Sequence, residues 1–119
     1  MKVTIYHNPR CSKSRQTLQL LQDKGIEPHI VEYLKTPPSS EQISSFLSKL
    51  NISARELMRS GETEYKENNL NDESLSQQEL LQSMQEHPIL IQRPIVVVED
   101  KDDTKVAIGR PPEDVLKIL

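Results

Sequence analysis

Residues 1–34 restrict the fold most, because they combine two strand patterns and one helical pattern with very little connecting chain. Residues 3–6 are β-branched or aromatic, which is typical of a short strand. Pro9 interrupts regular structure, a helix is expected over residues 12–24, and residues 29–34 form a second strand pattern. Two strands joined by a single helix lie parallel, with a right-handed crossover. The chain therefore opens with the unit from which open α/β sheets are built.

The middle of the chain is predicted to be a helical insertion over about residues 36–87. It contains three capping boxes, in which a serine and an acidic or amide residue three positions later satisfy the first N–H groups of a helix. The three pairs are Ser39 with Gln42, Ser53 with Glu56, and Ser76 with Glu79. No strand pattern occurs within this insertion.

The end of the chain returns to strand patterns. Residues 94–98 have the apolar composition of a buried strand, and residues 106–109 form a shorter one. The charged residues 99–105 between them are expected to form a turn, so the pair predicts an antiparallel hairpin.

A final helix is expected after the hairpin. Pro111 and Pro112 suit its first turn, where a missing N–H group costs nothing. Three apolar residues are expected to face inward from it: Val115, Leu116 and Leu119.

This order of elements predicts an α/β, thioredoxin-like fold with a mixed four-stranded sheet that the helical insertion interrupts. A chain of 119 residues is long enough for one core, and we expect a single domain over residues 1–119.

Charge and composition exclude several classes of function. The net charge of −3 and the lack of a basic run give no general attraction to nucleic acid. No apolar stretch approaches the length of a membrane span, and no secretory signal is visible, so a cytoplasmic protein is expected. The three histidines lie far apart and the chain has one cysteine, so neither a disulfide nor a bound metal is expected.

Cys11 stands at the expected start of the first helix, among polar and basic residues. Free N–H groups at a helix start and the helix dipole favour the thiolate, which is the reactive form of cysteine. The same N–H groups can bind an oxyanion. The alternative is an inert, packed cysteine, the commoner role of a single cysteine in general.

Three neighbours of Cys11 are candidates for the same site. Ser14 can donate a hydroxyl hydrogen bond toward the sulfur, Arg15 lies one helical turn along the same face, and His7 can approach from the preceding loop. A plain structural role stays open for Ser14 as a helix residue and for His7 as a residue that closes the loop.

Three arginines lie at the ends of expected elements. Arg59 ends a short helix, Arg93 directly precedes Pro94, and Arg110 follows the last strand. Guanidinium groups bind tetrahedral oxyanions through two hydrogen bonds at once, which lysine cannot match. For each arginine taken singly, a solvated surface side chain is the alternative interpretation.

Two well-known cysteine motifs are absent. The phosphatase loop requires five residues between its cysteine and arginine, whereas three separate Cys11 from Arg15. A dithiol motif requires a second cysteine where Ser14 stands. Disulfide chemistry at Cys11 must therefore take its second thiol from outside the chain.

The chain resembles the glutaredoxin-dependent arsenate reductase family along nearly its whole length. The segments that carry the resemblance occur in the same order in both: YHNPRCSKSRQTL, ARELMR, HPILIQRPIVV and IGRPPE. The resemblance implies a thioredoxin-like fold with a helical insertion, as the order of elements already predicts.

The resemblance also implies roles for individual residues. The nucleophile corresponds to Cys11, and the nearby histidine and serine correspond to His7 and Ser14. The oxyanion-binding residues correspond to Arg59, Arg93 and Arg110. The peptide bond before Pro94 is implied to be cis.

The activity implied is that of an oxidoreductase that reduces arsenate to arsenite in arsenic detoxification. Glutathione is the implied co-substrate and glutaredoxin the implied partner, with no bound cofactor. Two other functions stay open. One is a transcription regulator of the Spx type, which shares the fold and binds RNA polymerase. The other is a monothiol reductase of glutathionylated substrates.

Overall fold

The computed structural model describes all residues from 1 to 119, and the chain divides into two compact units. The first unit comprises Met1–Thr36 and Arg93–Leu119, and the second comprises Pro37–Gln92. The single domain expected from the sequence stays a prediction. No helix in the chain is long and apolar enough to cross a membrane.

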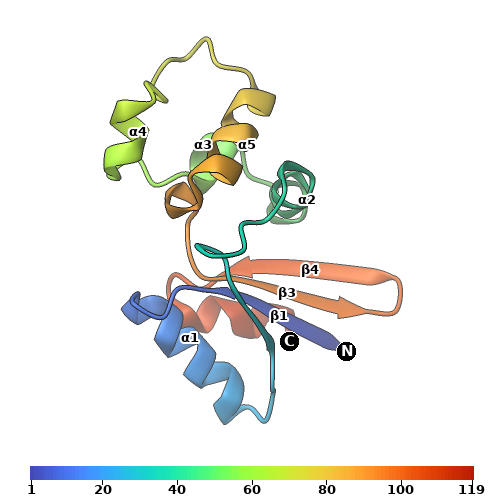
Figure 1. Ribbon diagram of the computed structural model, residues 1–119. Helices are drawn as coiled ribbons and strands as arrows, with labels where there is room; N and C mark the ends of the chain where they lie inside the picture. Colours follow the sequence, from blue (N-terminus) through green and yellow to red (C-terminus); the bar gives the residue numbers. More distant parts are fainter. The chain divides into compact units, whose positions relative to one another are not determined.

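The first unit is a mixed four-stranded sheet with helices, and Figure 1 labels three of its strands, β1, β3 and β4. Its elements are β1 (Lys2–His7), α1 (Ser12–Asp23), β2 (His29–Glu32), β3 (Ile95–Asp100), β4 (Asp103–Ile108) and the 3₁₀ helix η2 (Pro112–Ile118). The strand order is β2-β1-β3-β4, in which β1 pairs parallel with β2 and the other pairs are antiparallel. The predicted thioredoxin-like α/β fold with a mixed four-stranded sheet is confirmed.

The core of the first unit lies on one face of the sheet. Val3 pairs with Val98 and Ile5 with Val96 across β1 and β3, and alternate residues of a strand point to the same face. These four side chains form a buried cluster with Leu21 of α1 and Val115 of η2. The helices α1 and η2 thus cover this face together, as Figure 1 shows.

The hairpin is longer than the sequence predicts. The paired strands continue to Asp100 and resume at Asp103, so the turn consists of Lys101 and Asp102 alone. Four of the charged residues that indicated a long turn are instead exposed strand residues: Glu99, Asp100, Asp103 and Lys105. Backbone pairing tolerates them because their side chains remain in water, and a two-residue connection is the commonest for a hairpin.

The final helix is a 3₁₀ helix, which corrects the prediction of its inward face. With three residues per turn, positions three apart eclipse each other, so Pro112, Val115 and Ile118 share one face. Val115 is fully buried and Ile118 packs on the core cluster. Leu119 is exposed, contrary to expectation.

The second unit is helical, with all three predicted capping boxes present. Its elements are α2 (Ser40–Leu50), α3 (Ala54–Leu57), α4 (Thr63–Glu67), α5 (Gln77–Glu86) and the 3₁₀ helix η1 (Pro88–Leu90). Serine side chains cap α2, α3 and α5 as predicted. The helix α4 was not predicted because it has no side-chain cap and buries no residue.

The insertion extends beyond its predicted end at residue 87. Met58 forms an isolated antiparallel bridge with Ile91, and the Gln92 N–H donates to the Leu57 carbonyl at 2.8 Å. These long-range bonds hold residues 88–92 in the helical unit, and no local pattern in the sequence indicates them.

Gly109 is required where β4 ends. A Cβ atom there would lie 2.5 Å from the Thr17 hydroxyl oxygen and 2.9 Å from the Pro94 ring. Both neighbours are buried, so neither can yield easily. We expect Gly109→Ala to lower the free energy of unfolding by about 1–3 kcal/mol through overpacking.

Urea denaturation checks this expectation. Gly61→Ala is the matched control, since nothing lies within 4 Å of the Cβ it would add. Equal stability losses for the two variants would show that Gly109 is not needed for close packing.

Candidate active site

Cys11 occupies the N-cap position of α1, as the sequence predicts for its helix. Its backbone is extended, with φ −94° and ψ 122°, and its carbonyl accepts the first helical hydrogen bond, from the Arg15 N–H at 3.0 Å. The Cys11 N–H donates to the Asn8 carbonyl at 3.0 Å, which closes the loop before the helix. Cys11 is partly exposed, which is compatible with the approach of an external reactant.

Several donors converge on the sulfur. Partial burial raises the pKa of the Cys11 thiol, but hydrogen bonds from the Ser14 backbone N–H, the Arg93 side chain and the Lys13 backbone N–H lower it. The positive charge of Arg93 lowers it further, and the net pKa lies below the ordinary value. The lowered pKa increases the fraction of thiolate at a given pH, and the thiolate is the nucleophilic form.

The Ser14 hydroxyl is engaged with the loop. Its oxygen lies 2.6 Å from His7 Nδ1 and accepts the Asn8 N–H at 3.0 Å. Ser14 therefore acts on the Cys11 sulfur through its backbone N–H, and not through the hydroxyl as its position in the sequence suggested. The buried contact between His7 and Ser14 joins the end of β1 to the first turn of α1.

His7 is a buried residue at the end of β1, with 6% of its surface exposed. Burial lowers the pKa of His7, the Glu32 carboxylate opposes this, and the Arg15 charge adds to the lowering. The net pKa is below the ordinary value, so the imidazole is neutral in the folded chain at neutral pH.

Arg15 is bound to the loop. Its Nη1 donates to the Pro9 carbonyl at 2.9 Å on the exposed side of the helix. The interactions that lower the pKa of Cys11 come chiefly from Ser14, Lys13 and Arg93. Arg15 is thus held by the loop, although its position in the sequence suggested a role at the sulfur.

Arg93 and Arg110 lie together in the first unit. The bond from Arg93 to Pro94 is cis, as the resemblance implies, and so is the bond from Arg110 to Pro111. Arg110 Nη1 donates to the Arg93 carbonyl at 3.2 Å, and its side chain is exposed. The side chains of Arg93 and Arg110 thus extend from adjacent backbone segments. The Arg93 side chain also hydrogen-bonds to the Cys11 sulfur.

Arg59 belongs to the second unit and has a carboxylate partner there. Its Nε lies 3.3 Å from Glu62 Oε1, with both side chains about three-quarters covered. The neighbouring Arg55 donates to the carbonyls of Leu70 and Asp72, at 2.7 and 2.5 Å, and so fixes the chain after α4. Arg55 is therefore occupied in maintaining the fold.

Two buried residues near Cys11, Asn8 and Tyr33, were not predicted from the sequence to belong to the site. Asn8 is buried, and its carboxamide oxygen accepts the Arg10 N–H at 3.0 Å. Tyr33 directly follows β2, which ends at Glu32, two residues earlier than predicted. Tyr33 is 1% exposed, and the charges of Arg93 and Cys11 both act on its hydroxyl. Neither residue belongs to a local motif.

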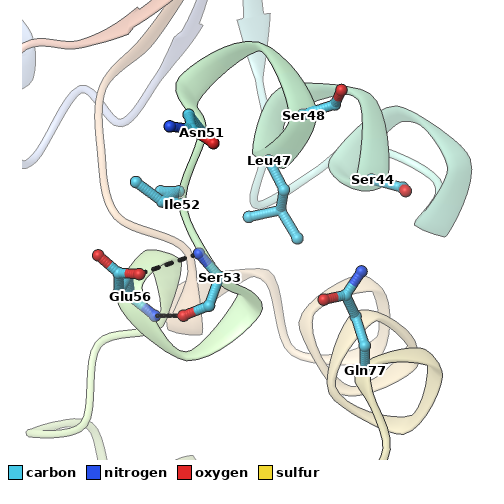
Figure 2. Close-up of a pocket in the computed structure, with 8 residues that line it drawn as sticks. All are labelled: Ser44, Leu47, Ser48, Asn51, Ile52, Ser53, Glu56 and Gln77. Atoms are coloured by element: carbon cyan, nitrogen blue, oxygen red, sulfur yellow. Dashed lines mark hydrogen bonds between the residues drawn. The ribbon is translucent and has the colours of Figure 1, made fainter.

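The helical unit offers a hollow of different character. It has a volume of about 370 Å³ and lies between α2, the start of α3 and the start of α5 (Figure 2). Its lining residues are Ser44, Leu47, Ser48, Asn51, Ile52, Ser53, Glu56 and Gln77. It has no nucleophilic thiol and no cation, and two of its polar residues are the capping box of α3. No group of three or more His, Cys, Asp and Glu side chains anywhere in the chain is arranged to hold a metal ion.

Comparison with known proteins gives consistent matches along the whole chain. The model of the ArsC family matches residues 6–118. An arsenate reductase of Haemophilus influenzae is 50% identical over 120 aligned residues, covering 100% of both chains. The protein named "Uncharacterized protein YfgD" of Escherichia coli K12 is 53% identical, covering 99% of this chain and 97% of its own. The solved structure of an arsenate reductase from Vibrio cholerae superimposes with a TM-score of 0.93 at 49% identity, covering 100% of this chain and 98% of that one.

The reactivity of the thiol tests the electrostatics of this site. We expect the rate of Cys11 alkylation to rise with pH around a midpoint below the free-thiol value of about 8.5. Arg93→Ala should move that midpoint upward, because it removes a hydrogen bond and a positive charge from the sulfur. Arg15→Ala is the matched control and should leave the midpoint unchanged. A wild-type midpoint at or above the free-thiol value would contradict the account.

The buried histidine predicts how stability depends on pH. Because the pKa of His7 is lowered on folding, the unfolded chain takes up the proton first as the pH falls. The stabilisation from neutral His7 is complete above the unfolded pKa of about 6.5 and is lost as the pH falls through the lower, folded pKa.

We therefore expect His7→Gln to reduce the loss of stability between about pH 7.5 and pH 5, since a glutamine does not titrate. Urea denaturation at a series of pH values measures this difference. His29→Gln, at an exposed position, is the control for the general effect of replacing a histidine with glutamine. An unchanged slope in the His7 variant would mean that His7 titrates alike in both states.

Proposed function

The chain belongs to the ArsC family, and we propose that it is an arsenate reductase of the glutathione and glutaredoxin type, reducing arsenate to arsenite. The observation that carries the proposal is the set of donors on one sulfur: two backbone N–H groups at the start of α1 and the Arg93 guanidinium. A family match alone does not require a reactive cysteine, whereas this arrangement supports one.

In the proposed reaction, arsenate is held next to Cys11 by charge-assisted hydrogen bonds. Arg93 and Arg110 are proposed to bind its oxygens, because they leave adjacent segments of the unit that contains Cys11. Arg59 is proposed as the third oxyanion-binding residue on the family resemblance alone. Donors fixed in advance by the fold stabilise charge that develops during reaction without further reorganisation.

The chemistry begins with attack of the Cys11 thiolate on arsenic, with loss of one arsenate oxygen as water. A glutathione thiol then supplies the second sulfur. Arsenic(V) accepts two electrons and leaves as arsenite, while the two sulfurs are oxidised to a Cys11–glutathione disulfide. Glutaredoxin reduces that mixed disulfide and restores the thiolate. The chain has one cysteine, so the second sulfur must come from outside it.

His7 and Ser14 are proposed to act by holding the loop that carries Cys11. Their hydrogen bond at 2.6 Å and the bond from the Asn8 N–H fix the first turn of α1, whose N–H groups face the sulfur. The cytoplasm, where glutathione keeps thiols reduced, is the compartment this mechanism requires.

A coupled assay tests the proposed function. NADPH oxidation is followed in the presence of glutathione, glutaredoxin and glutathione reductase, and it should depend on added arsenate. Cys11→Ser should abolish the activity while keeping the fold, and Arg93→Ala should lower kcat/KM about 10²–10³-fold, the range for loss of an oxyanion donor.

Two outcomes would overturn the proposal. Oxidation that needs a glutathionylated substrate and ignores arsenate would make the protein a monothiol reductase instead. Robust turnover with thioredoxin in the absence of any small thiol would exclude the glutathione step.

A further inference from the structure

Tyr33, Asn8 and Arg93 lie at the same end of the sheet, where β1 and β2 finish and β3 begins. In the parallel pair β1–β2 the last register partners are His7 and Glu32, so the next position on each strand brings Asn8 level with Tyr33. In the antiparallel pair β1–β3, Tyr6 is opposite Ile95, and two further steps bring Asn8 level with Arg93. Continued by one or two steps, the strand register thus places the three residues next to one another where the loop to Cys11 leaves β1, and Arg93 and Asn8 both act on the Tyr33 hydroxyl.

The burial of Tyr33 calls for a physical reason. β2 is an edge strand whose residues are mostly exposed, yet Tyr33 immediately after it is 1% exposed and among the largest fully buried side chains. A buried tyrosine hydroxyl normally has a hydrogen-bond partner. Here the hydroxyl oxygen is buried beside Arg93 and Asn8, without a hydrogen bond of standard geometry. Burial of this polar atom has a cost that packing alone does not explain.

A neutral oxygen beside an arginine differs from a carboxylate in its effect on the guanidinium charge. A carboxylate that oriented the guanidinium would also cancel much of its charge, as the Glu62 carboxylate does for Arg59. A phenol oxygen is neutral, so its dipole can orient a neighbouring guanidinium without itself offsetting the positive charge. Burial raises the pKa of Tyr33, more than the opposing charge of Arg93 lowers it, so the phenol stays neutral.

We propose that Tyr33 is a positioning residue that holds the Arg93 guanidinium toward the Cys11 sulfur and the bound oxyanion. Asn8 occupies the adjoining position, and its side chain completes the polar cluster behind Arg93. The part of this inference that concerns the oxyanion rests on the proposed function, whereas the part that concerns the sulfur does not.

A double-mutant cycle on thiol reactivity tests the inference without arsenate. Tyr33→Phe removes one oxygen and keeps the ring, so the fold is retained and circular dichroism verifies it. The midpoint of Cys11 alkylation against pH should rise in Tyr33→Phe. It should show no additional rise when Tyr33→Phe is combined with Arg93→Ala, because Tyr33 acts through Arg93.

A second tyrosine–arginine contact provides the control. The Tyr65 hydroxyl accepts a hydrogen bond from Arg55 at 3.3 Å in the helical unit. Tyr65→Phe should leave the alkylation midpoint unchanged, which separates the effect of Tyr33 from the general loss of a phenol.

The arsenate assay then extends the test. Tyr33→Phe should raise the KM for arsenate roughly three- to tenfold, the effect of one weakened hydrogen bond. An unchanged midpoint in Tyr33→Phe, or equal rises with and without Arg93, would overturn the inference. If the midpoints behave as expected and no arsenate is reduced by the wild type, the proposed function fails and the positioning role of Tyr33 stands.

Discussion

The antiparallel pairing of β1 with β3 is the constraint on which the rest of the structure depends. It places Val3 against Val98 and Ile5 against Val96, which forms the core beneath α1 and η2. The same register brings the loop after β1 level with the residues before β3. The start of α1 and the Arg93 side chain thus meet at one end of these strands. A single pairing therefore supports the core of the unit and also brings Arg93 to the Cys11 sulfur, beside the N–H groups that α1 itself supplies.

Local patterns in the sequence were sufficient to predict much of this arrangement. The position of Cys11 at a helix start follows from Pro9 and the helical pattern after it, because backbone N–H groups are free at any helix start. The capping boxes of α2, α3 and α5 were predicted for the same reason, since both partners lie three residues apart. The order of strands and helices was then sufficient for the fold class.

The remaining features depend on tertiary contacts, which local patterns in the sequence do not predict. Tyr33 belongs to the cluster around Arg93 only because of the register of three strands, which no local pattern reveals. The engagement of Ser14 with His7 depends on how β1 meets α1. The predicted inward face of η2 was partly wrong, because the chain forms a 3₁₀ helix with three residues per turn and not an α-helix with 3.6. Packing against the sheet decides between the two.

The most direct test of the central claim is the mass of the protein after a single turnover. The wild-type chain is mixed with one equivalent of arsenate and excess glutathione, without glutaredoxin, and the products are separated under acid conditions. The account predicts one glutathione joined by a disulfide to the peptide that contains Cys11, together with one arsenite released per adduct. Release of arsenite without any adduct, or an adduct that forms equally well without arsenate, would contradict it.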